Sequence, residues 1–403
     1  MYFDAASQYL RRQMRALQKN IEFIAEQYKG DVPLTHFLKA YFKAHPVLGS
    51  RDRKIIADAV YSYYRCALFL DDTLTLWEQV LVSLTLAENG NPHTLKLLPE
   101  ALQQLQSADT DNKTEALLQM GYLSAGNIKR LEASPSLSDG ITASEWHRSL
   151  WQKPRVFFSV TKGKEQKVIT LLKQAEIVFL EEGNNCFSCN ANTAIEKILA
   201  PGDYRVQDFS SQNTAAYFAL SPGCSVWDCC SGAGGKSLLA SDSEPSIRLT
   251  VSDIRSSILH NLKERFRLYK KTLPEQLLLS AADAAALETT LGNRTFDQII
   301  ADVPCTGSGT WARTPEQFYF FDTAQIRAFS ERQKQILNNI SRYVKPGGHI
   351  TYITCSVFRD ENESVLASFL ENNNRYELLQ SGILNGISRK ADNMFASLIR
   401  RKA

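Results

Sequence analysis

Apolar residues recur at helical spacing through the first third of the chain. The first stripe consists of Leu10, Met14, Leu17, Ile21 and Ile24. Similar stripes lie within residues 34–42, 55–64 and 77–84, and Pro33 and the turn at 46–49 separate the first three. Steps of three and four place such positions on one face of a helix. The pattern predicts an all-helical domain over residues 1–135.

A short stretch of small and polar residues at 134–140 marks a boundary. Beyond it the pattern predicts strands over 156–160 and 176–180, with a helix over 164–174 between them. These elements predict a small α+β subdomain over residues 141–205.

Strand and helix patterns then alternate from residue 206 to the C-terminus, residue 403. Such alternation predicts a mostly parallel sheet with helices on both faces, and ligands of these sheets bind beyond the carboxyl ends of the strands. Predicted strands end at or near Asp228, Asp253, Asp302 and Cys355. We therefore expect these four side chains to face one crevice of a Rossmann-like α/β domain over 206–403.

A glycine-rich loop follows the first of these strands, with the sequence Cys-Cys-Ser-Gly-Ala-Gly-Gly-Lys-Ser at 229–237. Its spacing matches neither a P-loop nor the dinucleotide motif. Asp253 follows Gly234 by nineteen residues, where an acid commonly binds ribose hydroxyls. Together with Asp283 in a later loop, the loop and this acid predict a nucleoside cofactor with a short polar tail, such as S-adenosylmethionine.

Two of the eight cysteines occupy polar, turn-forming surroundings at strand ends, namely Cys305 and Cys355. A cysteine thiolate is a strong nucleophile near neutral pH, so this placement favours covalent chemistry. Cys186 and Cys189 have the spacing of zinc ligands, but no second Cys/His pair accompanies them, and no metal site is predicted.

The stretch 302–309 (Asp-Val-Pro-Cys-Thr-Gly-Ser-Gly), followed by Arg-Thr-Pro-Glu at 313–316, resembles the signature of the RNA cytosine-5 methyltransferases of Fmu/Sun type. The Thr-Cys-Ser and Glu-Asn-Glu stretches at 354–356 and 361–363 are similar to a second motif of that family. Residues 204–212, 228–237 and 392–396 resemble three more, so the likeness covers roughly residues 145–400. Five motifs in the family's order favour an S-adenosylmethionine-dependent enzyme that methylates RNA, with ribosomal RNA as the expected substrate.

The resemblance implies a mechanism. Cys355 would attack carbon 6 of cytosine, Asp302 would hold or protonate the ring at nitrogen 3, and Cys305 would assist removal of the carbon 5 proton. The target base would have to be unpaired or flipped out. The residues implied in cofactor binding are Cys230, Ser231, Gly232, Ala233, Gly234, Gly235, Lys236, Asp253, Asp283 and Asp302.

Two departures from the family pattern affect binding loops. Ser231, Gly232 and Ala233 stand where the family has Ala-Ala-Pro, which loosens the glycine-rich loop. Ser-Val-Thr at 159–161 stands where an Arg-x-Asn is expected in the small subdomain, which puts substrate contacts there in doubt.

The N-terminal stretch 49–65 is similar to NusB-like RNA-binding domains. The first 70 residues hold 11 Lys/Arg against 6 Asp/Glu, whereas the whole chain has a net charge of +3. Clustered cations suit a phosphate backbone, although charge alone favours a solvated helix face.

Neither a secretion signal nor an apolar run of about 20 residues is apparent, which favours a cytoplasmic protein without a membrane partner. We expect a monomer. Three alternatives remain open on the sequence: a transfer RNA substrate, a DNA cytosine methyltransferase, and a non-catalytic RNA-binding factor. The DNA enzymes are expected to carry their nucleophile in Pro-Cys rather than Thr-Cys, and a binding factor would not need both thiols.

Overall fold

The computed structural model describes residues 2–88, 91–133 and 135–403, with side chains from residue 13 onward. The side chains of Leu10, Arg11 and Arg12, and residue Ser134 of the predicted boundary, lie outside the described residues. The chain divides into two compact units. One contains residues up to 135 together with 142–153 and 311–322, and the other contains 136–141, 154–310 and 323–403.

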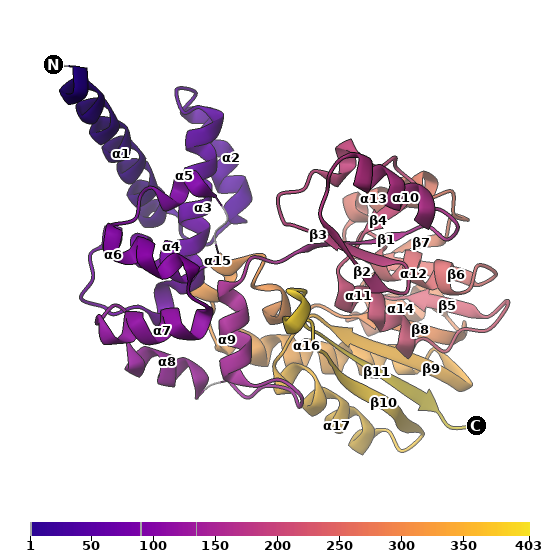
Figure 1. Cartoon of the computed structure of the whole chain (residues 1–403). Coiled ribbons are helices and arrows are strands. Elements are labelled where there is room, and N and C mark those ends of the chain that lie inside the picture. Colours follow the sequence, from indigo (N-terminus) through magenta and orange to yellow (C-terminus); the bar gives the residue numbers. More distant parts are fainter. Residues whose placement is uncertain (1, 89–90, 134) are drawn as a thin grey trace. The chain divides into compact units, whose positions relative to one another are not determined.

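The first unit is built from α-helices, as the apolar stripes predict (Figure 1). Leu17, Ile21 and Ile24 of the first stripe are buried, whereas Met14 is 41% exposed. Thr75 and Glu78 form a capping box that fixes the start of α4. The helices are α1 (Tyr2–Gln27), α2 (Leu34–Ala44), α3 (Ser50–Cys66), α4 (Leu76–Leu86), α5 (Pro92–Leu95), α6 (Glu100–Gln103), α7 (Thr110–Gln119), α8 (Ala125–Glu132), α9 (Ala143–Trp151) and α15 (Pro315–Tyr319).

Helix α15 comes from the middle of the second half of the sequence but packs inside this helical unit. The ring of Tyr319 lies 5.2 Å from that of Tyr64, and the ring of Trp311 lies 5.6 Å from that of Trp146. The buried carboxylate of Glu316 accepts a hydrogen bond from the backbone of Leu34, at 3.3 Å. The segment 311–322 is therefore part of the helical core.

The second unit contains a small four-stranded sheet of order β2-β3-β1-β4, with antiparallel neighbours. Its elements are β1 (Val156–Val160), α10 (Glu165–Gln174), β2 (Phe179–Gly183), β3 (Cys186–Cys189) and β4 (Tyr204–Val206).

The predicted second strand of this small sheet was placed too early, because Glu176 has φ +55 and cannot continue a strand. Asn184 and Asn185 both have positive φ and connect β2 to β3, the backbone of a type I′ hairpin turn. This Asn-Asn pair was the unused sequence signal for the hairpin.

The larger sheet has seven strands in the order β10-β11-β9-β8-β5-β6-β7. The strands are β5 (Ser225–Asp228), β6 (Arg248–Asp253), β7 (Glu275–Leu278), β8 (Phe296–Asp302), β9 (Val344–Thr354), β10 (Tyr376–Leu384) and β11 (Met394–Arg401). Neighbours among β5 to β9 are parallel, whereas β10 and β11 pair antiparallel. The predicted Rossmann-like α/β sheet is confirmed, and the antiparallel pair was missed.

Helices cover both faces of this sheet (Figure 1). Trp227 and Ile299 pack into a cluster that contains Leu287, Ile336 and Phe369 of α14, α16 and α17. Their strand neighbours Val226 and Ile300 point to the other face, in a cluster with Ala240 of α12. The helices that follow the small sheet's strands in this unit are α11 (Phe209–Asn213), α12 (Gly235–Ser243), α13 (Ser256–Leu268), α14 (Ala284–Leu291), α16 (Ala324–Ser341) and α17 (Glu363–Asn372).

The order of the strands defines where a ligand should bind. The chain runs outward from β5 to β6 and β7, then returns to place β8 on the other side of β5. Such a reversal opens a crevice beyond the carboxyl ends of the two strands. Asp302 ends β8 and lines a cavity at this crevice. Asp228 ends β5 but is fully buried and does not line that cavity, so its predicted place in the crevice is wrong.

Candidate active site

A cavity of about 460 Å³ opens at the carboxyl ends of the parallel strands. It is lined by residues that follow each of the five strands β5 to β9, together with two residues of α16. The lining residues are Cys229, Cys230, Asp253, Ile254, Arg255, Leu279, Ser280, Ala281, Ala282, Asp302, Val303, Pro304, Cys305, Arg332, Ile336 and Cys355. The predicted residues Cys230, Asp253, Asp302, Cys305 and Cys355 are thus brought together.

The two thiols of the cavity touch. The Sγ atoms of Cys305 and Cys355 are 3.1 Å apart. The backbone N–H of Cys355 also donates to Sγ of Cys305, at 3.3 Å. The hydrogen bond with Cys355 and burial raise the pKa of the Cys305 thiol well above its usual value. Cys305 therefore stays protonated and can donate to the neighbouring sulfur.

Glu361 fastens the loops that carry these thiols to each other. Its carboxylate accepts from the backbone N–H and the hydroxyl of Thr306, at 2.9 and 2.6 Å, and from the hydroxyl of Ser356, at 2.5 Å. Gln333 of α16 donates to the same carboxylate, at 3.0 Å. Glu361 is fully buried, and four hydrogen bonds offset the cost of burying its charge. Sequence reasoning used Glu361 only as part of a motif and missed this role.

Gly309, in the loop that carries Cys305, is hydrogen-bonded both to Cys355 and to a third loop, which contains Asn393. Its N–H donates to the carbonyl of Cys355, and Asn393 donates its N–H to the carbonyl of Gly309, both at 2.9 Å. A Cβ on Gly309 would lie 1.9 Å from the carbonyl oxygen of Asn393. The three motifs around residues 309, 355 and 393 therefore meet through backbone contacts that only glycine permits.

The glycine-rich loop between β5 and α12 takes a conformation that explains two of its glycines. Gly232 and Gly234 have φ of +50 and +81. A Cβ on Gly234 would lie 2.9 Å from Cγ of Leu262. The N–H of Gly232 donates to the carboxylate of Asp253, at 3.1 Å, which joins this loop to the end of β6. Of the predicted loop residues 230–236, only Cys230 lines the cavity.

Lys236 does not line the cavity but forms an ion pair with Asp302, which does. Its buried ammonium lies 3.1 Å from the carboxylate of Asp302 and 2.9 Å from the hydroxyl of Ser211. Lys236 thus fixes the orientation of Asp302, whose side chain is 31% exposed.

The carboxylate of Asp253 is ionised. Burial acts to raise its pKa, but hydrogen bonds from Arg255 outweigh burial and the pKa is lowered. The guanidinium of Arg255 reaches both carboxylate oxygens, at 3.0 and 3.2 Å, and is 59% exposed. A ligand that displaced this exposed side chain would find free acceptor positions on Asp253.

Asp283 has a different place from the predicted one. It is exposed and caps α14, where it accepts from the N–H groups of Ala285 and Ala286 at 3.1 and 3.0 Å. Its neighbours Ala281 and Ala282 line the cavity instead. Among the residues that the structure describes, no group of His, Cys, Asp and Glu could hold a metal ion.

Comparison with known proteins bears on the same part of the chain. Residues 215–398 match the family model described as 16S rRNA methyltransferase RsmB/F. This stretch is therefore similar to the methyltransferase domain that the model describes. The stretch carries the cavity, both thiols and the glycine-rich loop, so the family resemblance noted in the sequence is confirmed for it.

Curated relatives carry a name that fits this domain. Ribosomal RNA small subunit methyltransferase B of Xanthomonas campestris is 31% identical over 174 residues, which is 43% of this chain and 39% of the relative. The protein of the same name from Yersinia enterocolitica is 26% identical over 248 residues, 59% of this chain and 56% of the relative. The chain thus spans about two-fifths to just over half of the length of these relatives.

Solved structures share the fold of this chain over about two thirds of its length or more. The crystal structure of PH0851 has a TM-score of 0.70 at 19% identity and covers 96% of this chain and 98% of its own. NSun6 from Pyrococcus horikoshii, solved with SFG, has a TM-score of 0.58 at 13% identity and covers 65% of this chain and 94% of its own. None of the helices in the described parts of this chain has the length and apolar character of a membrane span.

Proposed function

We propose that this chain transfers a methyl group from S-adenosylmethionine to carbon 5 of a cytosine in RNA. The observation that carries the proposal is the pair of touching thiols, which line one cavity together with Asp302 and Asp253. Ribosomal RNA is the favoured substrate because the matching family model and the curated relatives are named for it.

The cavity suits the cofactor in size and chemistry. Its volume of about 460 Å³ lies in the usual range for small-molecule sites. Asp253 would bind ribose hydroxyls, and the apolar side chains of Leu279, Ala281 and Pro304 would contact the base. Bound there, S-adenosylmethionine supplies an electrophilic methyl group.

Cys355 is the proposed nucleophile. Its sulfur forms a bond to carbon 6 of the cytosine, and the electron pair of the carbon 5–carbon 6 double bond moves toward carbon 5. The protonated thiol of Cys305 stabilises the Cys355 thiolate before attack because it can donate a hydrogen bond at 3.1 Å.

Asp302 is proposed to act at the nitrogen 3 proton of the ring, and Cys305 at the carbon 5 proton. Asp302, oriented by Lys236, is proposed to hold the ring at nitrogen 3 and stabilise its protonated form. Once carbon 5 carries the methyl group, the Cys305 thiol gives its own proton to solvent, and the resulting thiolate accepts the carbon 5 proton. The electron pair left behind restores the double bond and expels Cys355.

The test supplies ribosomal and transfer RNA separately, together with S-adenosylmethionine carrying an isotope-labelled methyl group. Mass spectrometry of the digested nucleosides should find labelled 5-methylcytidine from ribosomal RNA. Label in transfer RNA alone would assign the other substrate. Label at another base, or none in either RNA, would contradict the proposal.

A further inference from the structure

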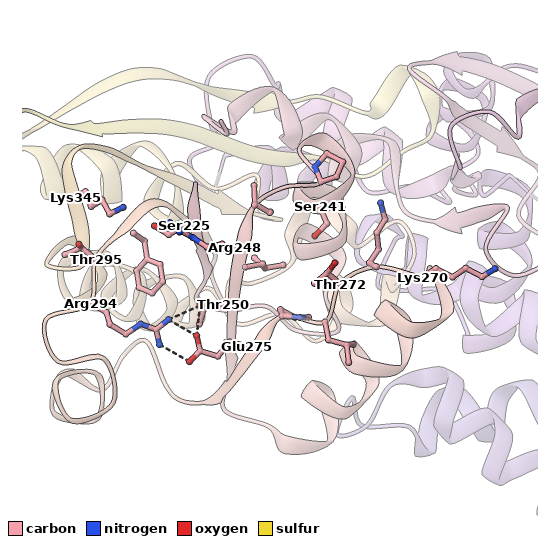
Figure 2. A pocket seen from close by; sticks show the side chains of 17 residues that line it. Ser225, Ser241, Arg248, Thr250, Lys270, Thr272, Glu275, Arg294, Thr295 and Lys345 are labelled. Atoms are coloured by element: carbon pink, nitrogen blue, oxygen red, sulfur yellow. Dashed lines mark hydrogen bonds and ion pairs between the residues drawn. The ribbon is translucent and has the colours of Figure 1, made fainter. Parts of the chain in front are cut away.

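A second cavity, of about 800 Å³, lies at the opposite edge of the large sheet (Figure 2). Ser225, Arg248, Glu275 and Phe296 are the first residues of β5, β6, β7 and β8, and all four line it. We call it the amino-end cavity. It is lined by Ser225, Ser241, Pro245, Ile247, Arg248, Leu249, Thr250, Lys270, Lys271, Thr272, Leu273, Pro274, Glu275, Arg294, Thr295, Phe296 and Lys345.

The lining of the amino-end cavity is basic. It contains five cationic side chains and a single carboxylate, that of Glu275. Three of the cations are paired: Arg294 with Glu275, Lys345 with Asp297, and Lys271 with Asp242. The other two, Arg248 and Lys270, are exposed and form no ion pair with the described residues. The cavity therefore keeps an excess of positive charge.

Lys270 holds its position at a conformational cost. It has φ +53, and it follows α13 at the point where Lys271 donates its N–H back to the carbonyl of Phe266, at 2.9 Å. This is the Schellman end of a helix, and glycine is the usual residue in its left-handed position. A lysine there keeps a charge in the cavity where glycine would fit the backbone better.

The cations form a row rather than one cluster. Figure 2 shows them spread along the amino-end cavity, from Lys345 and Arg294 at one end to Lys270 at the other. A neighbouring cavity of about 830 Å³ shares Lys270 and Lys271 and continues past Arg205 toward β1. A row of separated cations suits the regularly spaced charges of a polyanion better than a single small anion.

We propose that the amino-end cavity binds the sugar-phosphate backbone of RNA, outside the nucleotide that enters the active site. The proposal rests on the RNA substrate of the proposed function. Arg248 and Lys270 contact phosphates directly, and the hydroxyls of Thr272 and Thr295 offer further hydrogen bonds to phosphate or ribose. Such contacts orient the RNA without reading its sequence.

The test measures binding of a fluorescent uridine oligomer of about 30 nucleotides to the full chain, at several potassium chloride concentrations. Arg248→Gln and Lys270→Gly should each weaken binding about 3- to 10-fold and lower the slope of log Kd against log salt by roughly 0.7. Lys270→Gly should leave the melting temperature unchanged or raise it, because glycine suits the backbone.

Arg267→Gln is the matched control. Arg267 lies three residues before Lys270 on α13, is 54% exposed, pairs with Glu264 and lines neither cavity. The control should keep the affinity and salt slope of the parent chain. Unchanged binding by both cavity variants would overturn the proposal, as would an equal loss in Arg267→Gln. Inorganic phosphate is compared with potassium chloride at the same ionic strength. If phosphate displaced the oligomer while chloride left it bound, the site would be a small-anion site and the proposal would be overturned.

Because the oligomer contains no cytosine, its binding is independent of methyl transfer. Loss of oligomer binding in the cavity variants would support the amino-end cavity even if no 5-methylcytidine were found. Methylation of RNA combined with unchanged oligomer binding would support the proposed function and reject the cavity.

Discussion

The backbone N–H of Cys355 donates to the sulfur of Cys305, and the two sulfur atoms are 3.1 Å apart. The thiols occupy different loops, fifty residues apart in the sequence, so this contact exists only in the folded chain. The contact and burial raise the pKa of the Cys305 thiol well above its usual value. This difference fits the proposal that Cys355 is the thiol that attacks.

Replacing the proposed nucleophile should stop the reaction. For Cys355→Ala we expect methyl transfer to fall by more than about 1,000-fold, because the ring can no longer be activated. Binding of S-adenosylmethionine, measured by calorimetry, should persist. A variant that retained a tenth of the parent activity would contradict the assignment.

Cys305→Ala should trap the intermediate instead. Without the thiol that assists proton removal, Cys355 cannot leave carbon 6, so a protein–RNA adduct should accumulate. A slower band that survives denaturing electrophoresis and disappears after ribonuclease treatment would reveal it. If the adduct formed with Cys355→Ala and not with Cys305→Ala, the two roles would be reversed.

Glu361→Gln should loosen both thiol loops. A glutamine side chain offers only one acceptor atom to the three partners Thr306, Ser356 and Gln333, so we expect a loss of about 2–4 kcal/mol in the free energy of unfolding. The charge of Glu361 also helps to keep the pKa of Cys305 high. Alkylation of Cys305 by iodoacetamide should therefore begin at lower pH in the variant.

Glu363→Gln is the control for this change, since Glu363 belongs to the same motif but binds Ser138 and Asp139 instead. It should leave the pH dependence of alkylation unchanged. An identical pH profile for Glu361→Gln and the parent chain would contradict the role given to Glu361.

Asp228 should make stability depend on pH. Burial raises its pKa from an ordinary 3.8 to about 7. Between about pH 4 and pH 7 the unfolded chain has lost this proton while the folded chain retains it, so the free energy of unfolding falls as the pH rises. Asp228→Asn removes this effect. Its stability relative to the parent should rise across that window by up to about 4 kcal/mol, as measured by urea denaturation.

Asp297→Asn should show the opposite trend. Burial acts to raise the pKa of Asp297, but Lys345 and Ser225 outweigh it and lower the pKa to about 2. Its contribution is therefore present above about pH 4 and lost as the pH falls toward 2. The variant should be less stable than the parent at neutral pH. Parallel curves for the two variants would contradict both assignments.

Gly309→Ala should disturb the active site through its backbone. The added methyl group would meet the carbonyl of Asn393, so we expect a loss of about 1–3 kcal/mol and a weaker adduct band in the Cys305→Ala background. Gly382→Ala, whose nearest neighbour would be the Tyr217 hydroxyl at 3.7 Å, is the control and should keep parental stability. Equal melting temperatures for both variants would contradict the tight contact.

The sequence predicted the residues that meet at strand ends. Asp253 and Asp302 end parallel strands and Cys355 follows one. The carboxyl ends of such strands share one edge of the sheet, so the alternation of strands and helices was enough to predict that these residues meet. Asp283 also sits in a loop after a strand, but its side chain caps α14, and capping competes for a carboxylate at that position.

Roles that depend on contacts across the fold could not be predicted. In the sequence, Glu361 cannot be told from an exposed acidic residue, because its partners Thr306 and Gln333 contact it only in the folded chain. The local sequence of helix α15 does not show where the helix packs, because the aromatic residues that it and the residue after it contact, Tyr28 and Tyr64, lie more than 200 residues earlier. The strands β10 and β11 were missed because the alternation of strand and helix ends before them.

The place of residues 311–322 has a consequence for dissecting this protein. A fragment that began at residue 154 would keep the sheet and both thiols but would lose the helices whose rings pack against Trp311, Phe318 and Tyr319. Those rings would then face water a few residues beyond Cys305. We expect such a fragment to aggregate on expression, so the half that contains the sheet has to be studied with its helical half attached.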